Sequence, residues 1–143
     1  MLADDDVDDC MLFREALGEM SLAAGLTTVS DGVELMRLLA SGEPLPDAIF
    51  LDLNMPKKNG FECLAEIKNN PGLQKIPVFI YSTSFASNVI DLLYKEGARH
   101  YIRKPADFGN LRLVIRHALS SLEKEEGLAH TSPEKFVLGP DEC

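Results

Sequence analysis

The stretch AIFLDLNMP, residues 48–56, decides how this chain folds. Its first four residues are all apolar, which is typical of a strand that helices cover on both faces of a parallel sheet. Asp52 follows this run directly, and Pro56 together with the pair Asn59-Gly60 predicts a turn into a helix. The stretch therefore predicts a buried strand that ends on a carboxylate.

Three other apolar runs, MLA, VFIY and HYI, also lead into polar residues. The residues at their ends are Asp4 with Asp5, then Ser82 and, after Arg103, Lys104. If all four runs are parallel strands of one sheet, their carboxyl ends share one edge. Carboxylates, a hydroxyl and an ammonium group would then lie together, and such a set is suited to Mg²⁺ and phosphate.

Segments with helical periodicity lie between these runs. The expected strands are residues 1–3, 26–29, 48–51, 78–81 and 100–103, and the last helix is expected at residues 108–123. Strict alternation with short connections predicts an α/β fold, because right-handed crossovers leave few other arrangements. We expect a doubly wound, five-stranded parallel sheet of the flavodoxin-like (βα)5 type with strand order 2-1-3-4-5. Asp4, Asp5 and Asp52 would lie at its switch point, between the first and third strands.

The length of the chain indicates a single domain. A domain of about 143 residues buries roughly 70% of the surface of its unfolded chain, which is enough for a well-packed core. We expect this domain at residues 1–122 and a polar tail at residues 123–143. The tail is too short for an output domain of its own.

Charge and hydropathy exclude several classes of protein. A net charge of −9 repels nucleic acid and anionic membranes, so we expect no direct contact with either. No apolar stretch approaches the roughly 20 residues that span a bilayer, and no secretory signal is visible, so a cytoplasmic protein is expected. The three cysteines are scattered without a C-x-x-C pair, which argues against a disulfide framework and a zinc site.

The acidic cluster after the first strand favours a divalent cation. Clustered carboxylates repel one another, and a cation removes this conflict. Oxygen ligands select a hard ion, and Mg²⁺ needs only one or two protein carboxylates because it keeps several waters. We assign Asp4 and Asp5 to the metal. For Asp6, Asp8 and Asp9 we favour helix capping and interaction with the helix dipole.

Together these motifs resemble the receiver domain of two-component response regulators, over residues 1 to about 122. The resemblance is carried by the Asp4-Asp5 pair, Asp52 in DLNMP with the later Gly60, Ser82, and Lys104-Pro105. Any one of these motifs is weak evidence. All of them in order, each at the end of an expected strand, make a strong match.

The resemblance implies a stand-alone receiver, which is a signalling phosphoprotein and not an enzyme. Asp52 would accept a phosphoryl group from a sensor histidine kinase or a histidine phosphotransfer protein in a Mg²⁺-dependent reaction. Phosphorylation would switch a protein-binding surface around the fourth helix, the fifth strand and the fifth helix. The chain would act either as a phosphorelay intermediate or as a direct binder of an unknown downstream protein.

The resemblance also implies a set of metal ligands. Asp5 and the carboxylate of Asp52 would bind Mg²⁺ directly, and Asp4 would hold it through water. Asn54 would contribute its backbone carbonyl.

Three further residues receive roles from the same resemblance. Lys104 would bridge to a phosphoryl oxygen as a point charge, and Ser82 would donate a hydrogen bond to the phosphoryl group. Tyr101 matches the switch aromatic of the family, which moves from a more exposed to a more buried position. The bond between Lys104 and Pro105 is expected to be cis.

Two alternatives compete with a phosphorylated receiver. A Mg²⁺-dependent phosphohydrolase of the haloacid dehalogenase type also forms an aspartyl phosphate, and Asp4-Asp5-Asp6 contains its D-x-D spacing. That alternative leaves the DLNMP segment without a role, and the chain has no room for a substrate-covering cap. A second alternative is an interaction module that has kept the fold and lost phosphorylation.

Overall fold

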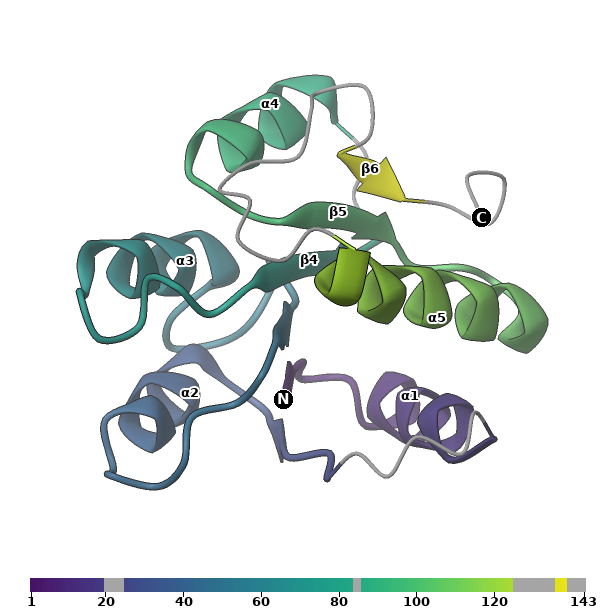
Figure 1. Cartoon of the computed structure of the whole chain (residues 1–143), viewed down its shortest axis with the longest axis horizontal. Coiled ribbons are helices and arrows are strands. Elements are labelled where there is room, and N and C mark those ends of the chain that lie inside the picture. The colour runs from purple at the N-terminus through teal and green to yellow at the C-terminus, as the bar shows by residue number, and fades with distance from the viewer. Residues whose placement is uncertain (20–24, 84–85, 125–135, 139–143) are drawn as a thin grey trace.

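The computed structural model describes residues 1–19, 25–83, 86–124 and 136–138, and it consists of a central sheet between two layers of helices (Figure 1). The strands are β1 (Leu2–Ala3), β2 (Thr28–Val29), β3 (Ile49–Leu51), β4 (Val78–Ser82), β5 (His100–Arg103) and β6 (Val137–Leu138). The helices are α1 (Val7–Glu19), α2 (Gly32–Leu39), α3 (Gly60–Asn69), α4 (Ser87–Lys95) and α5 (Phe108–Lys124). The predicted alternation of strands and helices is confirmed.

The sheet is parallel throughout and has the order β2-β1-β3-β4-β5-β6. The predicted order of the first five strands is therefore correct, and β1 lies between β2 and β3 as a switch point requires. This order places the residue after β1 beside the residue after β3.

The prediction of five strands is incomplete, because the sheet has a sixth. Residues 136–138 belong to the expected polar tail. Val137 and Leu138 form β6 beside β5, and Phe136 directly precedes this strand. Phe136 and Leu138 are almost completely buried, so this short apolar segment gains enough from burial to leave water and join the sheet. The other residues of the expected tail beyond α5 lie outside the described residues.

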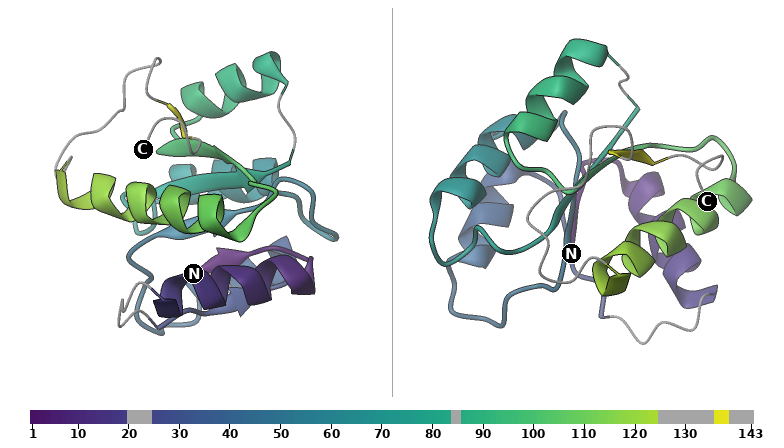
Figure 2. Two further views of the ribbon diagram at one scale, coloured as in Figure 1. Left: turned by 90° about the vertical axis from the view of Figure 1, so that its right-hand side faces the viewer. Right: turned by 45° about the horizontal axis from the view of Figure 1, so that its top comes forward.

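Helices α1 and α5 cover one face of the sheet, and α2, α3 and α4 cover the other (Figure 2). Strand β3 shows how the sequence supports both layers. Phe50 packs into the core under α1 and α5, where its ring centroid is 4.9 Å from that of Phe13. Ile49 and Leu51, which point to the opposite face, belong to the core under α2, α3 and α4. A strand buried on both faces must be apolar at every position, as this one is.

The turn after β3 is fixed by the start of α3. Asn59 caps this helix: its side chain accepts a hydrogen bond from the amide of Glu62, and the side chain of Glu62 accepts one from the amide of Asn59. Gly60 donates its amide to the carbonyl of Leu53 at 3.0 Å. A β-carbon on Gly60 would lie 2.3 Å from the carbonyl oxygen of Asp52, so only glycine allows this close approach.

The described residues include no helix with the length and apolar character that crossing a membrane requires.

Candidate functional site

The polar residues predicted from the sequence meet at the carboxyl edge of the sheet. Backbone hydrogen bonds hold the strand ends in register there: Asp4 donates its amide to Val29, and Asp52 donates its amide to Ala3. Lys104 donates its amide to the carbonyl of Ser82 at 2.9 Å. Segments far apart in the sequence are thereby fixed at one edge.

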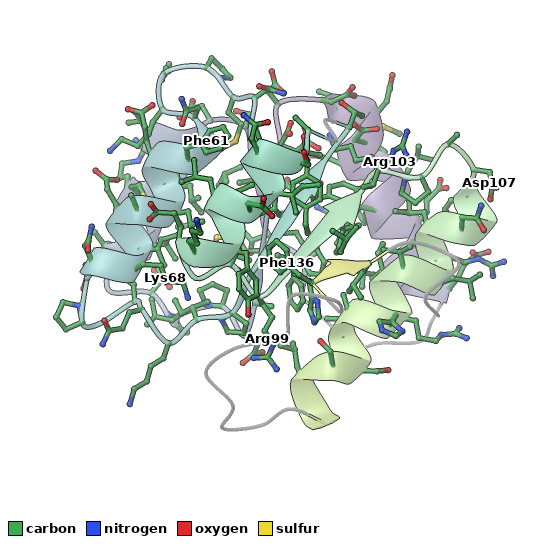
Figure 3. All side chains as sticks on the ribbon, turned by 90° about the horizontal axis from the view of Figure 1, so that it is seen from above. Phe61, Lys68, Arg99, Arg103, Asp107 and Phe136 are labelled. Carbon is green, nitrogen blue, oxygen red and sulfur yellow. The ribbon has the colours of Figure 1, made fainter. Side chains whose placement is uncertain are left out.

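Figure 3 shows the molecule from above, so that the edge formed by the carboxyl ends of the strands can be compared with the opposite edge, formed by their amino ends. Arg103 at the end of β5 and Asp107 before α5 are labelled on the side of the site, together with Phe61 at the start of α3. Lys68 and Arg99 are labelled at the opposite edge.

Three carboxylates form the centre of the site. Each of Asp4, Asp5 and Asp52 offers an oxygen atom within 4.8 Å of those of the other two. Asp4 and Asp52 are buried, whereas Asp5 is exposed. The cluster is therefore anchored in the fold on one side and open to water on the other.

Lys104 brings a positive charge into this cluster. Its Nζ lies 2.8 Å from Oδ2 of Asp4 and 3.6 Å from Oδ2 of Asp52, and it also lies 5.1 Å from the centroid of the Tyr81 ring. A solvated surface lysine would make none of these contacts. Only 10% of the Lys104 side chain is exposed.

One residue of this network, Asp9, was not predicted from the sequence. Its Oδ2 lies 2.9 Å from Nζ of Lys104, whereas its place at the start of the first helix had favoured capping. Capping is performed by Asp6, whose carboxylate accepts hydrogen bonds from the amides of Asp8 at 2.9 Å and Asp9 at 3.2 Å. The sequence held no signal for this pair, because an acidic residue at a helix start suits a cap and an ion pair equally well.

The charges of these groups depend on burial and on one another. Burial raises the pKa of Asp52 to about 6, with Lys104 acting against this shift and Asp4 adding to it. Burial alone would lower the pKa of Lys104, but its hydrogen bonds to Asp4 and Asp9 and the negative charges of Asp4 and Asp52 together outweigh that effect and raise the pKa above its ordinary value. At neutral pH Lys104 is an ammonium ion, and Asp52 is mostly ionised.

Ser82 and Tyr101 lie behind the cluster, and neither has measurable exposure to solvent. Burial raises the pKa of Tyr101, and a side-chain hydrogen bond with Ser82 acts in the opposite direction. Ser82 is the last residue of β4, and Tyr101 lies on the neighbouring strand β5. A switch aromatic was expected to alternate between a more exposed and a more buried position, and Tyr101 is in the more buried one.

Asn54 is exposed in the turn after β3. Its amide lies 3.5 Å from Oδ1 of Asp52, which keeps the backbone of this turn close to the carboxylate cluster.

The expected cis bond between Lys104 and Pro105 is not found, since no cis peptide bond occurs among the described residues. A trans bond before proline is favoured by about 0.5–1 kcal/mol in the absence of opposing contacts. The expectation of a cis bond was therefore wrong.

The donor atoms of the cluster fit a hard divalent ion. All the side-chain ligands that the cluster offers are carboxylate oxygens, and they are close enough to share one ion. The exposed position of Asp5 leaves one side open for the waters that Mg²⁺ retains.

Comparisons with known proteins agree with this geometry. The family model for the response regulator receiver domain matches residues 1–116. Response regulator Rcp1 of Synechocystis sp. is 36% identical over 121 residues, which cover 81% of this chain and 82% of that protein.

Solved structures give the same result. The phosphorylated cyanobacterial phytochrome response regulator RcpA has a TM-score of 0.77 at 36% identity, with 85% of this chain and 89% of that chain covered. The Mn²⁺-bound form of response regulator Rcp1 has a TM-score of 0.76 at 30% identity, with 92% and 96% covered.

Proposed function

Because this chain belongs to the response regulator receiver family, we propose that Asp52 is its phosphoacceptor and that Lys104 is the cation that assists it. One observation carries the proposal: the Lys104 ammonium group lies 3.6 Å from the Asp52 carboxylate, at the edge where Asp4 and Asp5 also meet. Phosphoryl transfer depends mainly on positioning and charge neutralisation, and this arrangement offers both.

In the proposed reaction an oxygen of Asp52 attacks the phosphorus of a phosphohistidine. The new oxygen–phosphorus bond forms as the phosphorus–nitrogen bond breaks, and the donor imidazole keeps the electron pair of that bond. Lys104 then faces the phosphoryl oxygens as a fixed positive charge. Ser82 can donate its hydroxyl to one of these oxygens in place of its interaction with Tyr101, because a phosphoryl oxygen is a strong, charged acceptor.

The carboxylates of Asp5 and Asp52 and the backbone carbonyl of Asn54 would hold Mg²⁺, with Asp4 binding through water. When bound, the ion would neutralise negative charge on the phosphoryl oxygens. The family includes a Mn²⁺-bound structure of Rcp1, which supports a divalent ion for this chain too.

The donor would be a sensor histidine kinase or a histidine phosphotransfer protein. RcpA is named as the response regulator of a phytochrome, so a phytochrome-type histidine kinase is the donor to test first. Transfer from such a kinase to this chain at a higher rate than from an unrelated histidine kinase would support this assignment, and equal rates would contradict it.

The surface that changes on phosphorylation would include α4, β5 and α5. In the structure β6 pairs with β5, and Phe136 packs against Tyr94 of α4 with ring centroids 5.2 Å apart. Strand β6 therefore lies next to the surface that a partner protein would meet.

Intact-mass measurement after incubation with acetyl phosphate and Mg²⁺ tests the phosphoacceptor. We expect a gain of one phosphoryl group per chain, which is lost in Asp52→Asn and retained in the matched surface variant Asp91→Asn. Phosphorylation that survives in Asp52→Asn would contradict the proposal. Release of many equivalents of phosphate per chain would instead favour the haloacid dehalogenase alternative, and a chain that never gains mass would favour the inert module.

A further inference from the structure

Lys104 has two close partners in this structure, and neither of them is the proposed phosphoacceptor. Its Nζ is 2.8 Å from Asp4 and 2.9 Å from Asp9, but 3.6 Å from Asp52. An ammonium group has three donors, so the two short contacts engage most of its capacity. A phosphoryl group that needs this ammonium must compete with at least one of them.

The two close partners differ in how easily they can be replaced. The side chain of Asp4 has no exposed surface, and its Oδ1 also accepts the amide of Asp6 at 3.0 Å. The side chain of Asp9 is 30% exposed. Water can therefore solvate an Asp9 carboxylate that loses Lys104, whereas a buried Asp4 carboxylate left unpaired would be costly. Asp9 is the partner that can be released.

We propose that Asp9 is a positioning residue for Lys104, holding the ammonium group toward α1 until a phosphoryl group takes it over. This inference rests on the proposed function of Asp52. A phosphoryl group carries more negative charge than a carboxylate and accepts stronger charge-assisted hydrogen bonds, so it can win this competition. Asp9 would thereby lower the affinity of the site for a phosphoryl group and limit the population of the phosphorylated form.

The neighbouring residue offers a matched control. Asp8 lies in the same first turn of α1, carries the same charge and is exposed. Among the described residues its carboxylate has no salt bridge, so Asp8→Asn removes the same charge from almost the same place without touching Lys104. Asp9→Asn keeps the shape of the side chain and removes only the charge that holds the ammonium.

The first measurement is the affinity of the full chain for beryllium fluoride in the presence of MgCl2, followed by amide chemical shifts. We expect Asp9→Asn to bind about threefold to fivefold more tightly than the wild type, which is the upper range for a partly exposed ion pair. Asp8→Asn should remain within about twofold of the wild type, and Asp9→Glu should restore wild-type affinity. Unchanged or weaker binding by Asp9→Asn, or the same gain in Asp8→Asn, would overturn the proposal.

The second measurement needs no phosphoryl analogue and no metal. The side-chain ammonium protons of Lys104 should exchange slowly with water in the wild type, because two carboxylates hold them. They should exchange several-fold faster in Asp9→Asn and at the wild-type rate in Asp8→Asn. Equal exchange in all three proteins would show that Asp9 does not hold Lys104 in solution.

The two proposals fail in different ways. If Asp52→Asn bound beryllium fluoride as tightly as the wild type, the phosphoacceptor assignment itself would fail. If binding required Asp52 but did not respond to Asp9→Asn, only the role of Asp9 would be lost. Thermal unfolding of each variant confirms that the compared proteins are folded.

Discussion

The carboxylate of Asp52 lies in surroundings that disfavour its charge. Only 6% of the residue is exposed, and the pKa of about 6 reflects this burial together with the neighbouring charge of Asp4. Lys104 offsets part of the penalty, but it is 3.6 Å away and is shared with two other carboxylates. The ionised nucleophile is therefore maintained at a cost to the stability of the folded protein.

This cost predicts that stability depends on pH through Asp52. Its pKa is about 6 in the folded protein against 3.8 as the ordinary value, so the folded state binds the proton more tightly. Without metal, the ionised carboxylate should destabilise the fold increasingly as pH rises from about 4 to 6, and by a constant amount above that range. We expect Asp52→Asn to be more stable than the wild type at pH 7.5, by on the order of 2 kcal/mol.

Urea unfolding in EDTA at several pH values measures this difference. It should shrink as the pH is lowered from about 6 toward 4, because the folded state then takes up the proton, and it should vanish only below 3.8, where Asp52 is protonated in both states. Asp91→Asn, which changes an exposed carboxylate on α4, should show no such trend. A wild type that is more stable than Asp52→Asn at pH 7.5 would show that burial does not dominate the energetics of this carboxylate.

At the scale of single elements, the turn between β3 and α3 depends on one glycine. A β-carbon at Gly60 would lie 2.3 Å from the carbonyl oxygen of Asp52 and 2.8 Å from Cα of Leu53, and both are backbone atoms that cannot turn aside. Gly60→Ala should therefore displace the turn that carries the phosphoacceptor. We expect a loss of about 2–4 kcal/mol in the free energy of unfolding, because the clash is with the backbone of a packed region.

Gly18→Ala is the control for this substitution. A β-carbon at Gly18 in α1 would meet no atom within 4 Å, and alanine is the better helix former. This variant should gain a few tenths to about 1 kcal/mol. Chemical denaturation of both variants gives the comparison, and equal effects would show that the close approach at Gly60 is relieved by small movements of the turn.

Strand β6 adds an element whose contribution can be measured separately. Phe136 is 2% exposed, packs against Tyr94, and accepts the amide of Tyr101 at 3.0 Å through its carbonyl. Phe136→Ala should weaken the docking of this segment by about 1–3 kcal/mol, less than for a central core position because a short edge strand can detach instead of leaving a cavity.

Hydrogen exchange of single amides tests this effect. The Tyr101 amide should lose protection in Phe136→Ala, since its acceptor is the Phe136 carbonyl. The amides of Arg99 and Lys104 donate to the carbonyls of Val78 and Ser82 on the other side of β5, so their protection should change little. Loss of protection at all three amides would mean that β5 itself depends on β6.

The elements differ in how far the sequence could predict them. Strand β3 was predictable because a short apolar run that ends on Asp52, between segments with helical periodicity, fits a buried strand far better than a helix or a loop. Strand β6 was not predictable, because three apolar residues within a polar segment do not indicate whether they pack against the sheet or stay in solvent. Asp9 was assigned to capping because acidic residues at a helix start suit a cap and an ion pair equally well, and only the position of Lys104 distinguishes the two.

At the scale of the whole molecule, the site joins parts of the chain that only the complete fold brings together. Lys104 and Asp4, 100 residues apart in sequence, lie 2.8 Å apart in space. Strand order accounts for the prediction that these residues share one edge: β1 and β3 are neighbours at the switch point, and β4 and β5 follow. The distances and ion-pair partners within the cluster depend on side-chain packing, and the pattern of apolar runs in the sequence does not predict that packing.

Removal of Lys104 should therefore weaken the entire fold. Lys104→Met keeps most of the length of the side chain but leaves the buried Asp4 and Asp52 carboxylates without a cation, and we expect a loss of about 3–5 kcal/mol in metal-free protein. Mg²⁺ should restore part of this loss, because it supplies positive charge to the same carboxylates. Thermal unfolding with EDTA and with MgCl2 gives both values. A variant as stable as the wild type in EDTA would show that the cluster relieves its repulsion by taking up protons.

The strands at the two sides of the sheet are shorter than the strand at its middle. Strand β4 in the interior has five residues, whereas the outermost strands β2 and β6 have two each. A long open border exposes rows of amide and carbonyl groups onto which another polypeptide can add a strand, which is how many proteins begin to aggregate. Over the described part of the chain, neither border is long enough to serve as such a template. A concentrated preparation of this protein should accordingly resist fibril formation better than a variant that lacks residues 136–138 and so leaves the four residues of β5 uncovered.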